Sequence, residues 1–220
     1  MSALRLGSVA PDFKANTTKG PISFHEWIGD SWAVLFSHPA DFTPVCTTEL
    51  GEVAKLSRAF EKRGVKAIGL STNGLDDHEK WIEDINEVGN VDVQFPIIAD
   101  ADRKVATLYD MLDSEEHDPT NVVNGIPFTV RSVFIIDPAK KIRLVIVYPA
   151  SCGRNFDEIL RVIDSLQLTD RKKIATPANW TPGKDVIVHV SVSNEEAEKE
   201  FPGYRQVRPY LRFASLPADA

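Results

Sequence analysis

The chain has 220 residues, of which 43% are hydrophobic and 26% are charged, so it can bury a substantial core and is not a disordered protein. Its net charge of −7, and the lack of a basic cluster beyond residues 171–173, argue against a protein that binds the phosphate backbone of nucleic acids. The longest apolar runs have the length of strands, so we expect no membrane-spanning segment.

The first predicted elements form a β-α-β unit. Residues 32–38 and 65–71 are short runs rich in apolar or β-branched residues, which predicts two buried strands. Between them, apolar residues recur at spacings of three and four over residues 50–60, which indicates one face of a helix that ends before Gly64. This order predicts two parallel strands joined by a right-handed crossover.

The middle of the chain continues the alternation of helices and strands. A helix is predicted over residues 75–88, followed by a short strand at 95–99 and a brief helix that Asp102 can cap. Strand patterns at 128–137 and 142–150 are separated by only four residues, so they form an antiparallel hairpin. We therefore expect a mixed sheet with helices on both faces.

A late helix beginning at residue 156 ends the predicted main domain, residues 1–168. The remaining segment, 169–220, opens with a linker-like stretch and contains one predicted strand and one helix. Ser193 and Glu196 have the spacing of a capping box at the start of that helix. So few elements cannot bury a core alone, so we expect this extension to pack on the main domain or on a second subunit.

Cys46 is one of only two cysteines, and it lies where a helix is expected to begin. If the helix starts near Pro44, the sulfur faces unpaired backbone N–H groups and the positive end of the helix dipole. Both favour the thiolate, which is the reactive nucleophile, over the thiol. Thr43 can cap the helix, and Pro39 stiffens its approach. Cys46 is therefore the candidate nucleophile.

The string PADFTPVCTTEL, residues 39–50, resembles the peroxidatic motif of the peroxiredoxins, in which proline, threonine and cysteine are spaced as P-x-x-x-T-x-x-C. The resemblance covers nearly the whole chain: residues 9–13 are similar to the family's opening strand, and GRNFDEILR at 153–161 to its late helix. Longer matching strings are most similar to the one-cysteine, peroxiredoxin-6-like branch. The resemblance implies a thioredoxin-like α/β fold, with a mixed sheet flanked by helices and a small C-terminal α+β extension.

This resemblance implies a thiol peroxidase that reduces hydrogen peroxide and organic hydroperoxides. Cys46 would attack the O–O bond and become a sulfenic acid. The Thr43 hydroxyl and the Arg131 guanidinium would hold the two oxygens, and Arg131 would also stabilise the thiolate. Fixed donors of this kind stabilise the charge that spreads over sulfur and oxygen in the transition state. Pro39 would shield the pocket.

Three further residues are supporting candidates. Glu49, one helical turn after Cys46, and Arg154 would form an ion pair that orients Arg131. His38 lies beside the motif, where the branch often has a pocket histidine, although a histidine at a strand end serves packing as readily as function. We expect no metal or other cofactor, because the cysteines and histidines lack the spacing of metal ligands.

The fate of the sulfenic acid depends on a second thiol. Two-cysteine peroxiredoxins have a resolving cysteine in a C-terminal string like V-C-P-A-G-W, where this chain has Thr176. The other cysteine, Cys152, lies where no pattern of the branch places a resolving thiol, and a disulfide needs Cα atoms within about 7 Å. We therefore expect a one-cysteine cycle in which an external thiol, glutathione or thioredoxin, reduces Cys46, and in which excess peroxide produces the sulfinic acid.

Other functions are weighed against this one. A cysteine hydrolase would need a histidine base and an oxyanion hole, and no hydrolase signature surrounds Cys46. A thioredoxin-type oxidoreductase would need a second cysteine two residues away. The alternative that stays open is a redox-inactive thioredoxin-like binding module or holdase, and the intact peroxidatic motif argues against it.

Peroxiredoxin-6-like proteins are also credited with a calcium-independent phospholipase A2 site on a serine in a G-x-S-x-G-like turn. Here the string is GDSWA, which contains Ser31 but lacks the last glycine. His25 matches the family's histidine, whereas Ala139 occupies the position of its aspartate, two residues from Asp137. We therefore expect phospholipase activity to be low or absent.

Compartment and assembly are predicted from the two ends of the chain. Residues 1–13 lack the features of a secretory signal, and two cysteines without such a signal indicate free thiols, so we expect a cytoplasmic protein. The branch usually forms homodimers through its C-terminal segment. The aromatic- and arginine-rich tail at 201–213 is compatible with this, so we expect a homodimer.

Overall fold

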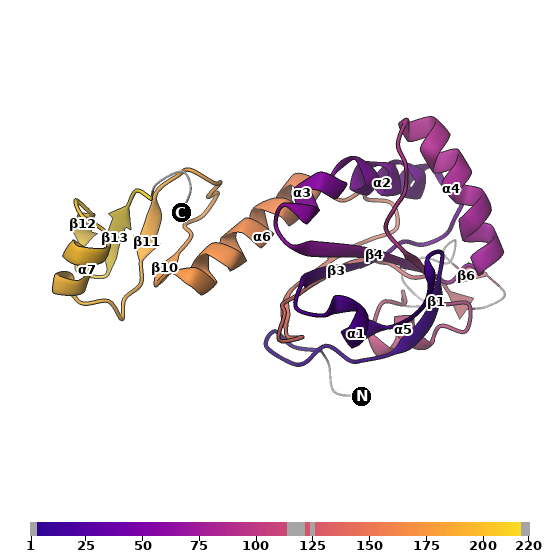
Figure 1. Cartoon of the computed structure of the whole chain (residues 1–220), viewed down its shortest axis with the longest axis horizontal. Coiled ribbons are helices and arrows are strands. Elements are labelled where there is room, and N and C mark those ends of the chain that lie inside the picture. Colours follow the sequence, from indigo (N-terminus) through magenta and orange to yellow (C-terminus); the bar gives the residue numbers. More distant parts are fainter. Residues whose placement is uncertain (1–3, 114–121, 124–125, 217–220) are drawn as a thin grey trace. The chain divides into compact units, whose positions relative to one another are not determined.

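The computed structural model describes residues 4–113, 122–123 and 126–216, and it divides into two compact units, Met1–Phe156 and Asp157–Ala220 (Figure 1). The division falls at the start of the late helix, α6 (Phe156–Arg171), rather than at residue 168, where the change in sequence composition placed it. The physical reason is that α6 continues without a break past that point, and Leu168 near its end packs in the core of the C-terminal unit.

The N-terminal unit is built on a mixed sheet of seven strands, in the order β2-β1-β5-β4-β3-β8-β9. Strands β3, β4 and β5 are parallel, whereas β8 runs antiparallel to β3 and to β9, as the hairpin pattern predicts. The opening strand starts later than expected from residues 9–13, since Val9 makes only an isolated bridge to Lys141. The strands are β1 (Lys14–Thr17), β2 (Gly20–Ser23), β3 (Trp32–Ser37), β4 (Val65–Ser71), β5 (Ile97–Ala99), β8 (Arg131–Ile136) and β9 (Ile142–Tyr148), while β6 (Val122–Val123) and β7 (Ile126–Pro127) pair separately.

Helices cover both faces of this sheet (Figure 1). One face carries α2 (Pro44–Lys55), α3 (Ser57–Glu61) and α4 (Leu75–Gly89), and the other carries α1 (Phe24–Ile28) and α5 (Lys104–Leu108). The single helix predicted between β3 and β4 is therefore two helices. Leu56, with φ −86° and ψ 4°, departs from helical geometry and separates α2 from α3.

The central strands are buried on both sides because helices lie on both sides. In β3, the side chains of Ala33 and Leu35 pack in a cluster with Phe24 of α1 and Val105 of α5. The alternation of side chains along a strand directs Val34 to the opposite face. This sandwich fixes the C-terminal ends of β3 and β4, and the chain leaves β3 there to enter α2.

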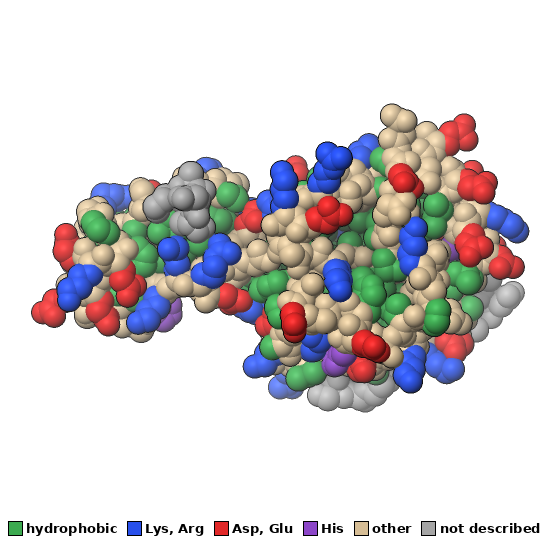
Figure 2. Space-filling model, in the orientation of Figure 1, with side chains coloured by type: hydrophobic (Ala, Val, Ile, Leu, Met, Phe, Trp, Pro, Cys, Tyr) green, Lys and Arg blue, Asp and Glu red, His purple; other side chains and the backbone are tan. Residues whose placement is uncertain are grey.

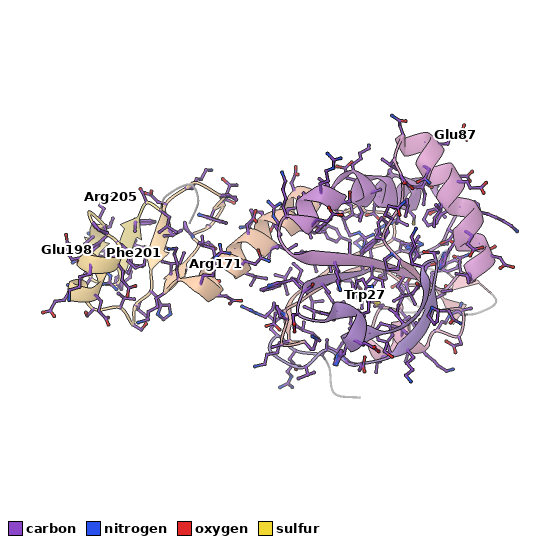
Figure 3. The ribbon with its side chains drawn as sticks, in the orientation of Figure 1. Trp27, Glu87, Arg171, Glu198, Phe201 and Arg205 are labelled. Carbon is purple, nitrogen blue, oxygen red and sulfur yellow. The ribbon has the colours of Figure 1, made fainter. Side chains whose placement is uncertain are left out.

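The C-terminal unit has a small core of its own, with more strands than the sequence predicts. Its antiparallel sheet has the order β10-β11-β13-β12, and Trp180, Val186 and Phe201 are among the buried side chains. The predicted capping box of Ser193 and Glu196 is present at α7. Phe201 and Arg205 of this unit are labelled in Figure 3. The elements after α6 are β10 (Ile174–Ala175), β11 (Val186–Val188), α7 (Asn194–Glu200), β12 (Arg205–Arg208) and β13 (Leu211–Ala214).

Acidic and basic side chains are interspersed over the surface seen in Figure 2, with hydrophobic side chains between them. Within the part of the chain that the structure describes, no helix is both long enough and apolar enough to cross a membrane. In the same residues, no group of three or more His, Cys, Asp or Glu side chains is arranged to hold a metal ion.

Candidate active site

Cys46 lies in the first turn of α2, where the sequence places it. The helix begins at Pro44, whose missing N–H is one that a helix start leaves unpaired in any case. The preceding Thr43 has an extended backbone, with φ −114° and ψ 146°, as a residue at the N-cap does. The side chain of Cys46 is fully buried. The sulfur is thus shielded from bulk water beside the positive end of the helix dipole.

Arg131, at the start of β8, is the cation next to this sulfur. Its Nη1 donates to Cys46 Sγ at 3.3 Å and to Glu49 Oε2 at 2.6 Å. Its Nε and Nη2 both donate to the Ala150 carbonyl, at 2.9 and 2.6 Å. All three nitrogens of the guanidinium therefore have fixed partners, and a buried arginine held in this way needs no reorganisation when charge develops next to it.

Glu49 and Arg154 form the support of Arg131. Glu49 Oε1 accepts from the backbone N–H of Arg154 at 2.7 Å and from its Nε at 3.0 Å, and Oε2 accepts from its Nη2 at 2.8 Å. Burial raises the pKa of the Glu49 carboxyl, but the charges and hydrogen bonds of Arg154 and Arg131 outweigh this and lower that pKa. One carboxylate thus pairs with two buried guanidinium groups. The two guanidinium groups thus leave surplus positive charge beside the Cys46 sulfur.

Thr43 and Pro39 lie in the loop between β3 and α2. The Thr43 hydroxyl donates to the Ala40 carbonyl at 2.9 Å and accepts no hydrogen bond from the start of the helix. Thr43 is thus the N-cap by position, but its side chain does not cap α2. Because its hydrogen is engaged, the hydroxyl oxygen has only lone pairs left for a further partner. Pro39 is buried.

His38 is fully buried and belongs to a chain of polar residues that sequence reasoning missed. Its Nε2 lies 2.8 Å from Asp41 Oδ1, and the other carboxylate oxygen, Oδ2, lies 2.5 Å from Nδ1 of His78 on α4. Burial raises the pKa of Asp41, but the hydrogen bonds from the two histidines outweigh this and lower it to about 2. Asp41 lies inside the peroxidatic motif, and His78 lies in α4, the helix that follows β4. These positions are the only sequence signal that could have identified the two residues as part of the site.

Cys152 lies on the surface, in the loop before α6, and both cysteines are free thiols. Its sulfur is 3.7 Å from the carbonyl of Gly153. Residues on either side of it contact the site, since Ala150 accepts from Arg131 and Arg154 binds Glu49. The structure therefore places Cys152 in a loop beside the site, while the Cys46 sulfur is directed to Arg131.

Two of the three candidate phospholipase residues, His25 and Asp137, have other side-chain partners. His25 Nε2 is 2.7 Å from the Ala10 carbonyl. The carboxylate of Asp137 accepts from the backbone N–H of Lys141 at 2.9 Å and from Arg143 Nη1 at 3.3 Å. None of these contacts of His25 and Asp137 involves Ser31. Low or absent phospholipase activity stays a prediction.

Comparisons with known proteins match the chain over almost its whole length. The model of the AhpC/TSA family matches residues 6–145, and that of the C-terminal domain of 1-Cys peroxiredoxin matches residues 165–203. A mitochondrial peroxiredoxin of Saccharomyces cerevisiae is 57% identical over 211 residues, which are 96% of this chain and 80% of that protein.

Two solved structures are similar in fold as well as in sequence. A cysteine-to-serine mutant of the peroxiredoxin 6 of Arenicola marina has a TM-score of 0.91 and 51% identity, and the match covers 98% of this chain and 99% of that one. A yeast mitochondrial 1-Cys peroxiredoxin has a TM-score of 0.89 and 56% identity, with 97% and 100% covered.

These comparisons correct one expectation and establish the family. The yeast relative is a mitochondrial protein, which overturns the cytoplasmic location expected from the sequence. The expectation rested on the composition of residues 1–13 and on the small number of cysteines, and neither feature distinguishes the cytoplasm from a mitochondrion. Sequence and structure agree along the whole chain, from the motif around Cys46 to the C-terminal unit. The chain belongs to the peroxiredoxin family, in its one-cysteine branch, and is a thiol peroxidase.

Proposed function

We propose that Cys46 is the peroxidatic cysteine and that Arg131 is the residue that activates it. The observation that carries this proposal is the position of Arg131 Nη1, which bridges the Cys46 sulfur and Glu49. The thiolate attacks one oxygen of a hydroperoxide, the O–O bond breaks, and the products are a sulfenic acid and water or an alcohol. Glu49 and Arg154 hold Arg131 in place, and Pro39 shields the pocket.

The hydrogen-bonding role that we propose for the Thr43 hydroxyl is narrower than the role that the resemblance alone implies. Its hydroxyl hydrogen is directed to the Ala40 carbonyl, so its oxygen is an acceptor. Arg131, by contrast, can only donate. We propose that Thr43 accepts the hydrogen of the peroxide O–H while Arg131 donates to the oxygens. The two residues together then recognise a protonated peroxide, because an oxygen without hydrogen would face the Thr43 lone pairs.

An external thiol, glutathione or thioredoxin, reduces the sulfenic acid in this proposal. In the yeast relative of known structure, the thiol-resolving mechanism uses the glutathione and thioredoxin systems. Position 176, where two-cysteine members have their resolving cysteine, is a threonine whose hydroxyl is 2.7 Å from that of Ser165. The surface thiol Cys152 has no assigned part in this cycle.

Assembly and compartment are proposed on the same basis. We infer a homodimer, since the aromatic and arginine side chains of the C-terminal segment suit an interface. We also infer a mitochondrial location, which is the location of the yeast relative. Size-exclusion chromatography with light scattering tests the first inference, and fractionation of cells that express the natural protein tests the second.

Stopped-flow measurement of peroxide consumption by the reduced protein tests the assignment of Cys46. The Cys46→Ser variant is expected to lose turnover while it keeps the fold, because only one buried atom changes. Cys152→Ser is the matched control and is expected to keep wild-type rates. A protein that does not consume peroxide would instead support the redox-inactive binding module.

A further inference from the structure

Asn73 lies in the connection between β4 and α4 and contacts the loop that carries Thr43. Its Oδ1 accepts a hydrogen bond from the backbone N–H of Asp41 at 3.0 Å. Its Nδ2 donates to Oδ2 of Asp77, in the first turn of α4, at 3.3 Å. The side chain thus joins the loop between β3 and α2 to the start of α4.

The two partners fix the orientation of the Asn73 amide. A backbone N–H can only donate a hydrogen bond, and a carboxylate can only accept one. The amide oxygen therefore faces Asp41 and the NH₂ group faces Asp77, because the opposite orientation would set donor against donor and oxygen against oxygen. The backbone N–H of Asn73 also donates to Ser71 Oγ at 3.2 Å, which ties the residue to the end of β4. Asn73 is therefore a fixed acceptor for the Asp41 N–H.

The N–H that Asn73 binds belongs to the same peptide group as the carbonyl that Thr43 binds. This group, between Ala40 and Asp41, gives its N–H to Asn73 Oδ1 at 3.0 Å and accepts from Thr43 Oγ1 at 2.9 Å through its carbonyl. A trans peptide group is planar, and its N–H and C=O point in opposite directions. An acceptor that fixes the N–H therefore also fixes the carbonyl. Asn73 and the Thr43 hydroxyl thus lie at opposite ends of one rigid unit.

The backbone of this loop needs such a restraint. Phe42, between Asp41 and Thr43, has a φ of 56°, in the left-handed region that a bulky side chain rarely adopts. A conformation of this kind persists only when surrounding contacts hold it. The side chain of Phe42 is exposed, so packing around its ring contributes little to holding the turn. The hydrogen bonds of the flanking residues, including the bond from Asp41 to Asn73, carry much of this restraint.

We propose that Asn73 is a positioning residue that fixes the peptide group between Ala40 and Asp41 and thereby keeps the hydrogen of the Thr43 hydroxyl away from the peroxide. The inference rests on the function proposed above, in which the Thr43 oxygen accepts the hydrogen of the peroxide O–H. If the peptide group rotates, the Thr43 hydroxyl loses its acceptor, and its hydrogen is free to face the peroxide hydrogen. Asn73 touches no reacting atom and takes part in no proton transfer.

Substitution of Asn73 tests the acceptor. Asn73→Ala removes Oδ1, and we expect the reaction of Cys46 with hydrogen peroxide to slow roughly tenfold, the effect of one lost hydrogen bond. The double variant Asn73→Asp/Asp77→Asn exchanges the two side chains without a change in net charge, so an oxygen still faces the Asp41 N–H. We expect this exchange to restore most of the rate. Asp76→Asn, at an exposed carboxylate of the same helical turn, is the matched control and should react at the wild-type rate.

A double-mutant cycle with Thr43 separates positioning from a general loss of stability. Thr43→Val removes the hydroxyl that Asn73 orients, and it should itself slow the reaction. Because Asn73 acts through that hydroxyl, Asn73→Ala should change the rate of the Thr43→Val protein by no more than about twofold. A further loss of about tenfold in that background would overturn the proposal. So would a wild-type rate in Asn73→Ala alone, or equal losses in Asn73→Ala and the exchange variant.

Hydrogen exchange followed by NMR tests the bond to Asp41 directly. The Asp41 amide should exchange slowly in the wild-type protein and much faster in Asn73→Ala. Exchange at the rate of a free amide in the wild-type protein would overturn the proposal, and this measurement needs no variant. Alkylation of Cys46 by iodoacetamide at alkaline pH involves no peroxide, so Asn73→Ala should keep the wild-type alkylation rate. Parallel losses of alkylation and peroxide reaction would also overturn the proposal.

Failure of this inference is distinguishable from failure of the proposed function. Wild-type protein that consumes no peroxide through Cys46, or a Thr43→Val protein that reacts at the wild-type rate, would refute the function on which the inference rests, and the inference with it. A slow Thr43→Val protein beside a wild-type rate in Asn73→Ala would refute the role of Asn73 alone.

Discussion

Arg131 Nη1 lies 3.3 Å from the sulfur of Cys46 and 2.6 Å from Oε2 of Glu49. A single nitrogen thus connects the nucleophile to the carboxylate that holds the arginine. The position of the cation is set by Glu49 on one side and by the Ala150 carbonyl on the other. The charge next to the sulfur is therefore part of the folded core, and changes to its partners should alter both stability and chemistry.

Replacement of Arg131 tests the chemical side of this relationship. We expect Arg131→Ala to slow peroxide reduction by roughly a hundredfold or more, because a preorganised donor to the reacting atoms is lost. Stopped-flow kinetics at neutral pH measure the rate. Arg143→Ala is the control, since Arg143 belongs to the neighbouring strand β9 and contacts Asp137 rather than the site. A rate within a few fold of wild type would show that Arg131 does not act on the reacting groups.

Replacement of Glu49 tests the structural side. Glu49→Gln leaves two buried guanidinium groups without a carboxylate, and we expect the free energy of unfolding to fall by about 3–5 kcal/mol. Urea titration followed by tryptophan fluorescence measures this difference. Glu52→Gln, three residues along the same helix, removes an exposed pair with Lys55 and should cost about 1 kcal/mol or less. Equal effects of the two substitutions would contradict a special role for Glu49.

The pKa of Asp41 leads to a prediction about acid stability. Hydrogen bonds from His38 and His78 outweigh the effect of burial and lower this pKa from 3.8 to about 2 in the folded protein. A lowered carboxyl pKa contributes stability that is present above pH 3.8 and is lost as the pH falls towards about 2. The difference in unfolding free energy between wild type and Asp41→Asn should therefore shrink over that interval.

Denaturant unfolding at a series of pH values measures this difference, with Asp92→Asn as a control at an exposed carboxylate. If the difference between wild type and Asp41→Asn stays constant down to pH 2, the hydrogen bonds to Asp41 do not favour its ionised form.

Mass spectrometry after one equivalent of peroxide tests the one-cysteine cycle. We expect a sulfenic acid on Cys46, which a small thiol traps as a mixed disulfide, and a sulfinic acid when peroxide is in excess. Cys152→Ser should turn over at the wild-type rate with glutathione or thioredoxin. A stoichiometric disulfide between Cys46 and Cys152, lost together with turnover in Cys152→Ser, would show instead that the surface thiol resolves the sulfenic acid.

Local sequence patterns determined much of the N-terminal unit. The apolar strands and the spacing of apolar residues in the helices predicted β3, β4, the hairpin of β8 and β9, and the helix that begins at Pro44. These features depend on neighbours within a few residues, so they can be read along the chain. The same locality explains why Cys46 was correctly placed in a first helical turn.

Local sequence patterns did not predict the shortest strands, nor which residue caps a helix. Strands β10, β12 and β13 have only two to four residues each, which is too few for a periodicity. The cap of α5 is another case. Asp102 accepts from Lys104 N–H at 3.3 Å, but Asp100 accepts more closely from the N–H groups of Val105 and Ala106, at 3.0 and 2.7 Å. The turn before the helix decides which carboxylate reaches it.

The arrangement of the site was decided by tertiary structure alone. Arg131 is 85 positions from Cys46, and Arg154 is 105 positions from Glu49, yet each pair is in hydrogen-bond contact. His78 reaches Asp41 from another helix, 37 positions away. From the sequence these residues could be named only through a resemblance, or not at all. Their contacts exist because the packed sheet brings the ends of β3 and β8 and one face of α4 together. Local sequence patterns do not predict contacts between segments that lie so far apart in the chain.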